Sequence, residues 1–134
     1  MTVINWDQSC SVGVNELDEA HKVLFGIANH MIQAVVEKRG DEDTHQVIDQ
    51  MIDYAERHFR REEELLELAK YPEREQHYAV HKRMMNEIRL YKSKYLAGNL
   101  EGSEVAEFLI DWIVNHIKHV DKKYTPFVQP VGAP

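Results

Sequence analysis

Two kinds of side chain that bind metals, imidazole and carboxylate, recur along this chain at helical spacings. The candidates are His21, His58, Glu62, His77, His81, His116 and Asp121. His58 precedes Glu62 by four residues, and the same spacing separates His77 from His81. On a helix, residues four apart lie on one face about 5–6 Å from each other. Each pair can therefore direct two donor atoms at one small volume.

This donor set favours a site for two metal ions. Imidazole suits zinc, copper, nickel and iron, and a carboxylate can bridge two cations. Zinc prefers four ligands, and magnesium and calcium prefer oxygen, so iron is the better choice and manganese the next. If both carboxylates and a solvent-derived oxygen bridge two six-coordinate metals, one coordination position stays open. We therefore expect two iron ions per chain and room for a small exogenous ligand.

Four long segments with helical periodicity contain all seven candidates. They span about 17–38, 43–70, 73–96 and 103–123, and glycine or proline lies between successive segments. In each segment apolar residues recur every three or four positions, on the same stripe as the candidates. The sequence predicts one all-α domain over residues 1–134, an antiparallel up-down-up-down four-helix bundle. A non-helical N-terminal arm, about 1–14, and a short C-terminal tail would flank it.

The candidates should meet at one level of this bundle. At 1.5 Å per residue, His21 lies about 25 Å from the end of its helix and His58 about 22 Å from the start of the next. Across the second connection, His81 lies about 22 Å from a helix end and His116 about 20 Å from a helix start. Asp121 is the exception, because five residues after His116 is about 140° round an ideal helix. We expect a π-type turn or another irregularity between these two residues.

A single buried histidine on an apolar stripe is usually an ordinary core residue. Five imidazoles and two carboxylates at one level are different, because their burial without partners would cost several kcal/mol per ion. A domain whose net stability is about 5–15 kcal/mol cannot absorb that cost. The number of candidates therefore favours a metal centre over an ordinary core.

Composition narrows the remaining function classes. The chain has 134 residues and a formal net charge of −7, which argues against nucleic acid as a partner. No apolar run approaches the roughly 20 residues of a membrane span, and the N-terminus lacks the features of a signal peptide. Cys10 is the only cysteine, so an intramolecular disulfide cannot form. We expect a cytoplasmic protein without membrane contact, and the sequence predicts no particular protein partner.

The motifs around the candidates resemble those of the hemerythrins, specifically the single-domain bacterial form. They read LDEAHK at His21, HFRRE, HYAVH, and DWIVNH followed by IKHVD at Asp121, and the resemblance covers about residues 6–124. It implies a non-haem di-iron site that binds O2 reversibly. In that family pattern one iron takes His77, His81 and His116, the other takes His21 and His58, and Glu62, Asp121 and a solvent-derived oxygen form the bridges.

We therefore expect O2 transport, storage or delivery rather than enzymatic catalysis. NO or small anions are alternative ligands at the vacant position. Four apolar side chains within a turn of the ligands, Leu24, Phe25, Phe59 and Trp112, are expected to surround that position beside the two-histidine iron. A sensor would usually carry a signalling domain, and a di-iron oxidase or peroxidase would use more carboxylates. Sensor, oxidase or peroxidase, and iron reserve remain the alternatives.

Overall fold

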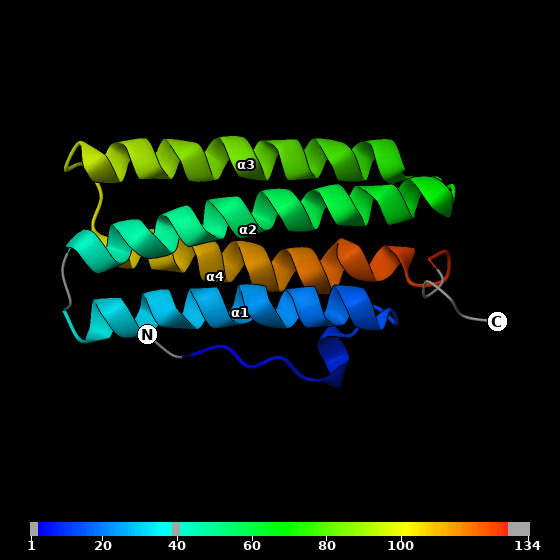
Figure 1. The fold of residues 1–134 in the computed structure, drawn as a ribbon, viewed down its shortest axis with the longest axis horizontal. Coiled ribbons are helices and arrows are strands. Elements are labelled where there is room, and N and C mark those ends of the chain that lie inside the picture. Colours follow the sequence, from blue (N-terminus) through cyan, green and yellow to red (C-terminus); the bar gives the residue numbers. More distant parts are fainter. Residues whose placement is uncertain (1–2, 39–40, 129–134) are drawn as a thin grey trace.

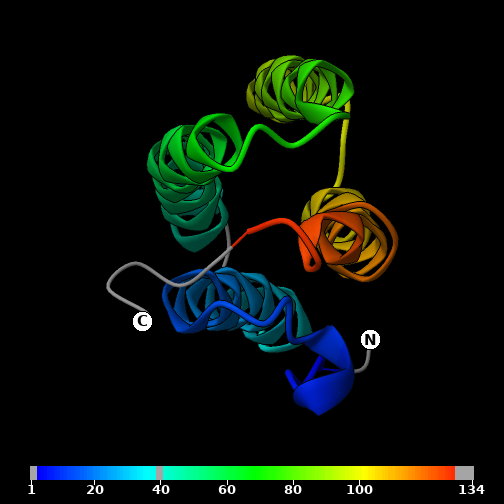
Figure 2. The same ribbon diagram turned by 90° about the vertical axis from the view of Figure 1, so that its right-hand side faces the viewer.

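The computed structural model describes residues 3–38 and 41–128, and these form four long α-helices and two short 3-10 helices. The elements are η1 (Gln8–Cys10), α1 (Asn15–Val36), α2 (Asp41–Leu68), α3 (Arg74–Leu96), α4 (Gly102–His119) and η2 (Asp121–Tyr124). Consecutive long helices run side by side in opposite directions (Figure 1), and the end view places them at four corners (Figure 2). The predicted all-α, antiparallel up-down-up-down bundle is confirmed. None of the helices in the described ranges has the length and apolarity to span a membrane.

The helix ends differ from the predicted ones by small amounts, with one exception. The first two helices lie two residues earlier than predicted, and the third begins one residue later. The fourth ends at His119 instead of continuing to 123, and the separate 3-10 helix η2 follows it. The arm is also not wholly non-helical, because η1 lies within it. The predicted tail beyond residue 128 lies outside the described residues.

Two apolar clusters fill the bundle. The large cluster extends along all four helices and includes Ile48, Met51, Ile88 and Leu109, each at most 1% exposed. The small cluster joins the end of the arm to the start of α1, the end of α2 and η2, and consists of Val12, Val14, Leu17, Leu65, Leu66, Tyr71, Tyr124 and Val128. Buried polar side chains lie where the two clusters meet.

The N-terminal arm is tied to the same end of the bundle as the small cluster. Asp18 in α1 accepts hydrogen bonds from the Val12 backbone N–H at 2.9 Å and from the Ser11 hydroxyl at 2.6 Å. Lys122 in η2 donates to the Ser9 carbonyl at 2.8 Å. The arm runs beneath α1 in Figure 1. These bonds connect it to both α1 and η2, and so restrain the segment that carries Asp121.

Candidate metal centre

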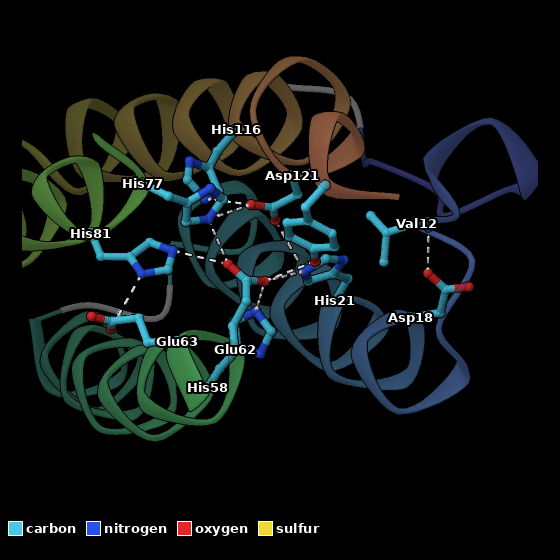
Figure 3. Close-up of polar contacts among 11 residues, drawn as sticks. Val12, Asp18, His21, His58, Glu62, Glu63, His77, His81, His116 and Asp121 are labelled. Carbon is cyan, nitrogen blue, oxygen red and sulfur yellow. Dashed lines mark hydrogen bonds and ion pairs between the residues drawn. The ribbon is translucent and has the colours of Figure 1, made fainter. Parts of the chain in front are cut away.

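The structure brings all seven predicted residues into one buried cluster, where each is at most 6% exposed. Donor atoms that lie within 4.8 Å of one another form two groups. One group is Glu62, His77, His81, His116 and Asp121, and the other is His21, His58 and Glu62. Figure 3 shows the rings directed at the two carboxylates from different helices. We call these seven residues the polar cluster.

The antiparallel order of the helices explains why distant residues meet. His21 and His77 lie in the first two turns of α1 and α3, while His58 and His116 lie in the second halves of α2 and α4. In an up-down-up-down bundle, the starts of the first and third helices adjoin the ends of the second and fourth. Counted from the opposite ends, His21 lies 15 residues before the end of α1 and His58 17 after the start of α2, while His81 lies 15 before the end of α3 and His116 14 after the start of α4. These similar distances put the rings at about one level, as the sequence predicts.

The junction of α4 and η2 solves the geometric problem of Asp121. The α-helix ends at His119, and Val120, with φ −109° and ψ −56°, leads into the 3-10 helix that begins at Asp121. The change directs the Asp121 carboxylate toward α4, so that Asp121 Oδ1 lies 2.8 Å from His116 Nε2. The predicted irregularity between these two residues is present. It takes the form of a 3-10 segment and not a π-type turn.

The two oxygens of Glu62 face different histidines. Oε1 lies 2.7 Å from His77 Nε2 and 3.0 Å from His81 Nε2. Oε2 lies 3.3 Å from His58 Nε2 and 3.5 Å from His21 Nε2. One carboxylate thus lies between two pairs of imidazoles.

Asp121 divides its oxygens in the same way. Oδ1 lies 2.8 Å from His116 Nε2 and 3.1 Å from His77 Nε2, while Oδ2 lies 3.1 Å from His21 Nε2. Each carboxylate therefore has one oxygen among the three-histidine group of His77, His81 and His116. Its other oxygen faces the two-histidine group of His21 and His58. This is the arrangement that two carboxylates bridging two cations require.

Many polar atoms of the cluster lie close together but do not form hydrogen bonds with one another. Both ring nitrogens of His21 and His116, Nε2 of His81 and both oxygens of Asp121 are buried and lack a hydrogen-bond partner. Their separations are those of ion pairs, but the directions are not those of hydrogen bonds. Buried polar groups are normally satisfied, and orphaned ones are costly. Metal ions inside the cluster would satisfy the Nε2 atoms and the Asp121 oxygens, which face one another, so the residues fit the expected group.

The protonation of the cluster shows what a metal would displace. Burial alone would raise the pKa of Glu62, but the surrounding imidazoles hold it well below its ordinary value. Burial lowers the pKa of His21, yet Asp121 and Glu62 outweigh it and raise this pKa to about 10. The same carboxylates raise the pKa of His77 to about 9. Without metal, His21 and His77 therefore retain protons, which metal binding must release.

Two contacts of the cluster were not predicted from the sequence. The buried Tyr124 hydroxyl donates to Glu62 Oε2 at 3.0 Å. Glu63 Oε2 lies 3.4 Å from His81 Nδ1, on the side of the ring away from the cluster. Tyr124 follows Asp121 by three residues, and in the 3-10 helix η2 positions i and i+3 point in the same direction. Glu63 is adjacent to a ligand candidate in the sequence, but adjacency on a helix does not place two residues together.

Two of the four predicted pocket residues, Phe59 and Trp112, stack on rings of the three-histidine group. Phe59 stacks on His81 with ring centroids 3.9 Å apart, and Trp112 stacks on His116 at 4.2 Å. The Phe59 ring also lies 5.9 Å from the ring of His58 in the two-histidine group. Leu24 and Phe25 are buried in the large apolar cluster. The pocket beside the two-histidine iron stays a prediction.

Comparison with known proteins agrees with the cluster. A family model described as the hemerythrin HHE cation binding domain matches residues 12–128. A bacteriohemerythrin of Stenotrophomonas maltophilia (strain R551-3) is 30% identical over 129 residues, covering 96% of this chain and 84% of the relative. One from Methylococcus capsulatus is 30% identical over 128 residues, covering 94% and 97%. A crystal structure of wild-type hemerythrin is 28% identical with a TM-score of 0.85, covering 94% and 98%.

Proposed function

Since this chain belongs to the hemerythrin family, we propose that its polar cluster holds two iron ions and binds O2 reversibly. One observation carries the proposal: Glu62 and Asp121 each place one oxygen among three imidazoles and the other toward two. Two ions bridged by both carboxylates match this division. A single octahedral ion cannot take five imidazoles and both carboxylates.

The proposed ligands follow from the two groups. His77, His81 and His116 hold one iron, His21 and His58 hold the other, and Glu62 and Asp121 bridge them. The ion with two histidines has fewer protein donors, so the open position belongs to it. When bound, the iron pair supplies the electrons that O2 binding requires. The protein holds the ions at fixed positions, because the ligands come from all four helices and η2.

Apolar side chains restrict the access of water and protons to the cluster. Phe59 and Trp112 cover two rings of the three-histidine group, and Leu24 and Phe25 are at most 4% exposed. We propose that these four residues form the O2 pocket. A dry wall slows the loss of the bound ligand to hydrolysis and proton transfer. The pocket also admits NO or small anions, since nothing larger fits a site this deeply buried.

We propose O2 transport, storage or delivery as the role, without catalysis. The relatives that match over nearly the whole chain carry the name bacteriohemerythrin. Within the part of the chain that the structure describes, the carboxylates inside the cluster are Glu62 and Asp121, and as bridges neither is left over to act as an acid or base on a substrate.

The test is a cycle of oxygenation. Ferrous protein prepared without air should contain two irons per chain, and its absorption should change on exposure to O2 and revert under inert gas over repeated cycles. The zinc-loaded protein is the control, because zinc has the same ligands to bind but no redox change. One iron per fully loaded chain, or oxidation that never reverts, would contradict the proposal.

A further inference from the structure

Tyr124 reaches the polar cluster from the same short helix as Asp121. A 3-10 helix has three residues per turn, so positions i and i+3 point in one direction. Asp121 and Tyr124 are the first and last residues of η2 and have this spacing. The hydroxyl of the tyrosine and the carboxylate of the aspartate are thereby delivered to one place.

The hydroxyl contacts one particular oxygen of the cluster. Tyr124 Oη donates to Glu62 Oε2 at 3.0 Å. Oε2 is the oxygen that faces His21 and His58, whereas Oε1 faces the three-histidine group. The hydrogen bond therefore acts on one half of the carboxylate only.

Packing holds the ring of Tyr124 in place. The residue is fully buried in the small apolar cluster. Its ring lies edge-on to Tyr71 with centroids 6.4 Å apart, and 5.7 Å from the ring of His77. The hydroxyl therefore has little freedom to point elsewhere.

We propose that Tyr124 is a positioning residue that makes the two ends of the Glu62 bridge unequal. A carboxylate oxygen that accepts a hydrogen bond has less electron density to donate to a metal, so Oε2 binds its ion more weakly than Oε1 does. The weaker donor favours the ferrous over the ferric state at the two-histidine ion. The consequence for iron rests on the proposed function, but the effect on the carboxylate holds for any divalent ion in the site.

The experiment compares two tyrosine-to-phenylalanine variants. Tyr124→Phe removes the hydroxyl and keeps the ring. Tyr71→Phe is the matched control, because Tyr71 belongs to the same cluster but its hydroxyl bonds to Glu73 instead. Both variants and the wild type are loaded with zinc, and their carboxylate stretching bands are recorded by infrared difference spectroscopy on protein labelled with 13C-glutamate. We expect two zinc ions in each protein. The glutamate band that appears only with zinc should shift in Tyr124→Phe and stay in place in Tyr71→Phe, where any change is confined to the metal-independent band of Glu73.

The iron-loaded proteins give a second readout. Tyr124→Phe should have a lower ferric/ferrous midpoint potential and oxidise in air severalfold faster than the wild type and Tyr71→Phe. An unchanged glutamate band together with an unchanged potential would overturn the role of Tyr124. If Tyr124→Phe fails to fold, wild-type zinc protein refolded in D2O replaces it, and the absence of a deuterium shift in the glutamate band would overturn the role instead.

These outcomes separate the two proposals. A shifted zinc-protein band without reversible O2 binding by the wild type would refute the proposed function and support the hydrogen bond. Reversible O2 binding with no shift in band or potential would support the proposed function and refute the role of Tyr124.

Discussion

The two ends of the four-helix bundle bury different kinds of side chain, apolar at one end and polar at the other. At one end α1 and α3 finish and α2 and α4 begin, and apolar side chains such as Ile48, Ile88 and Val105 meet there without exposure. At the other end the polar cluster occupies the centre. Apolar burial is favourable by itself, at about 25 cal/mol per Å². Burial of charged groups is unfavourable until each has a partner.

This difference teaches how the molecule can be both folded and ready for metal. The apolar end needs nothing but the chain. The cluster end has orphaned nitrogens and oxygens that the protein does not satisfy. It is held in place by the small apolar cluster and by the arm bound to Asp18 and Lys122. Stability should therefore depend on metal at one end and not at the other.

The largest expected effect comes from Glu62→Ala. Four imidazoles face this carboxylate, so its loss should remove the bridge to both groups and reduce the content from two irons per chain to one or none. Metal analysis after loading and desalting measures it. Glu63→Ala is the control, since Glu63 is the next residue and touches only the outer side of His81. Retention of two irons by Glu62→Ala would remove the basis for a bridged pair.

The sequence predicts the polar cluster well because helical geometry is regular. His58, Glu62, His77 and His81 have the four-residue spacing that places side chains on one face, and antiparallel helices of known rise set their level. The resemblance to the hemerythrins assigns the same residues. Tyr124 could not be predicted in this way, because its direction depends on where α4 stops, and the φ and ψ of Val120 are a consequence of packing at the helix end.

The helix-end interactions and the ring contacts also could not be predicted from the sequence. The fourth helix begins with a capping box between Glu101 and Glu104, a pairing of two acids that ordinary capping preferences do not favour. The stacking of Phe59 on His81 and of Trp112 on His116 was not predicted either. Both outcomes depend on contacts between elements, which a pattern along one element does not contain.

Ile88→Ala should weaken the apolar end alone. Ile88 is fully buried in the large cluster, and truncation of such a residue costs about 2–5 kcal/mol. Chemical unfolding should show the same loss of unfolding free energy in the zinc-loaded and the metal-free variant. The variant should still bind two zinc ions per chain. A loss of metal content would mean that the two ends are coupled, contrary to the comparison above.

The metal-free and zinc-loaded proteins should respond to pH in opposite directions. The pKa values of His21 and His77 rise from 6.5 to about 10 and about 9, so the stability they contribute is complete below pH 6.5 and is lost as the pH rises through these values. The Tm of the metal-free protein should fall over this range. Zinc instead needs deprotonated imidazoles, so the loaded protein should be less stable in acid.

Thermal melts from pH 5 to 10 measure both profiles. The carboxylates do not reverse the expectation, because the pKa values of Glu62 and Asp121 are lowered and their contribution is lost only at acid pH. A metal-free Tm that stays constant from pH 6.5 to 10 would show that the cluster's ion pairs add nothing to stability.

The smallest effect should come from Glu63→Gln, which keeps the size of the side chain and removes its charge. A carboxylate on the outer nitrogen of a metal-bound histidine orients the ring and makes it a better donor, and its loss usually weakens metal binding by 10–100-fold. Here the contact with His81 Nδ1 is long, 3.4 Å, and the Glu63 side chain is 34% exposed, so water screens the pair. We expect a zinc affinity reduced about tenfold or less, measured by competition with a chelator.

The control is Glu64→Gln, which removes one charge from the adjacent position. Glu64 is 56% exposed and pairs with Arg61 at 3.1 Å, away from the histidines. An equal loss in both variants would mean that affinity follows the net charge of α2 and not the contact with His81. A loss confined to Glu63→Gln, and smaller in high salt, would extend the polar cluster outward by one residue. The interactions that support the metal site would then extend to the surface between α2 and α3, through the partly exposed Glu63. The apolar end of the bundle has no such polar connection between its centre and the surface in the residues described above.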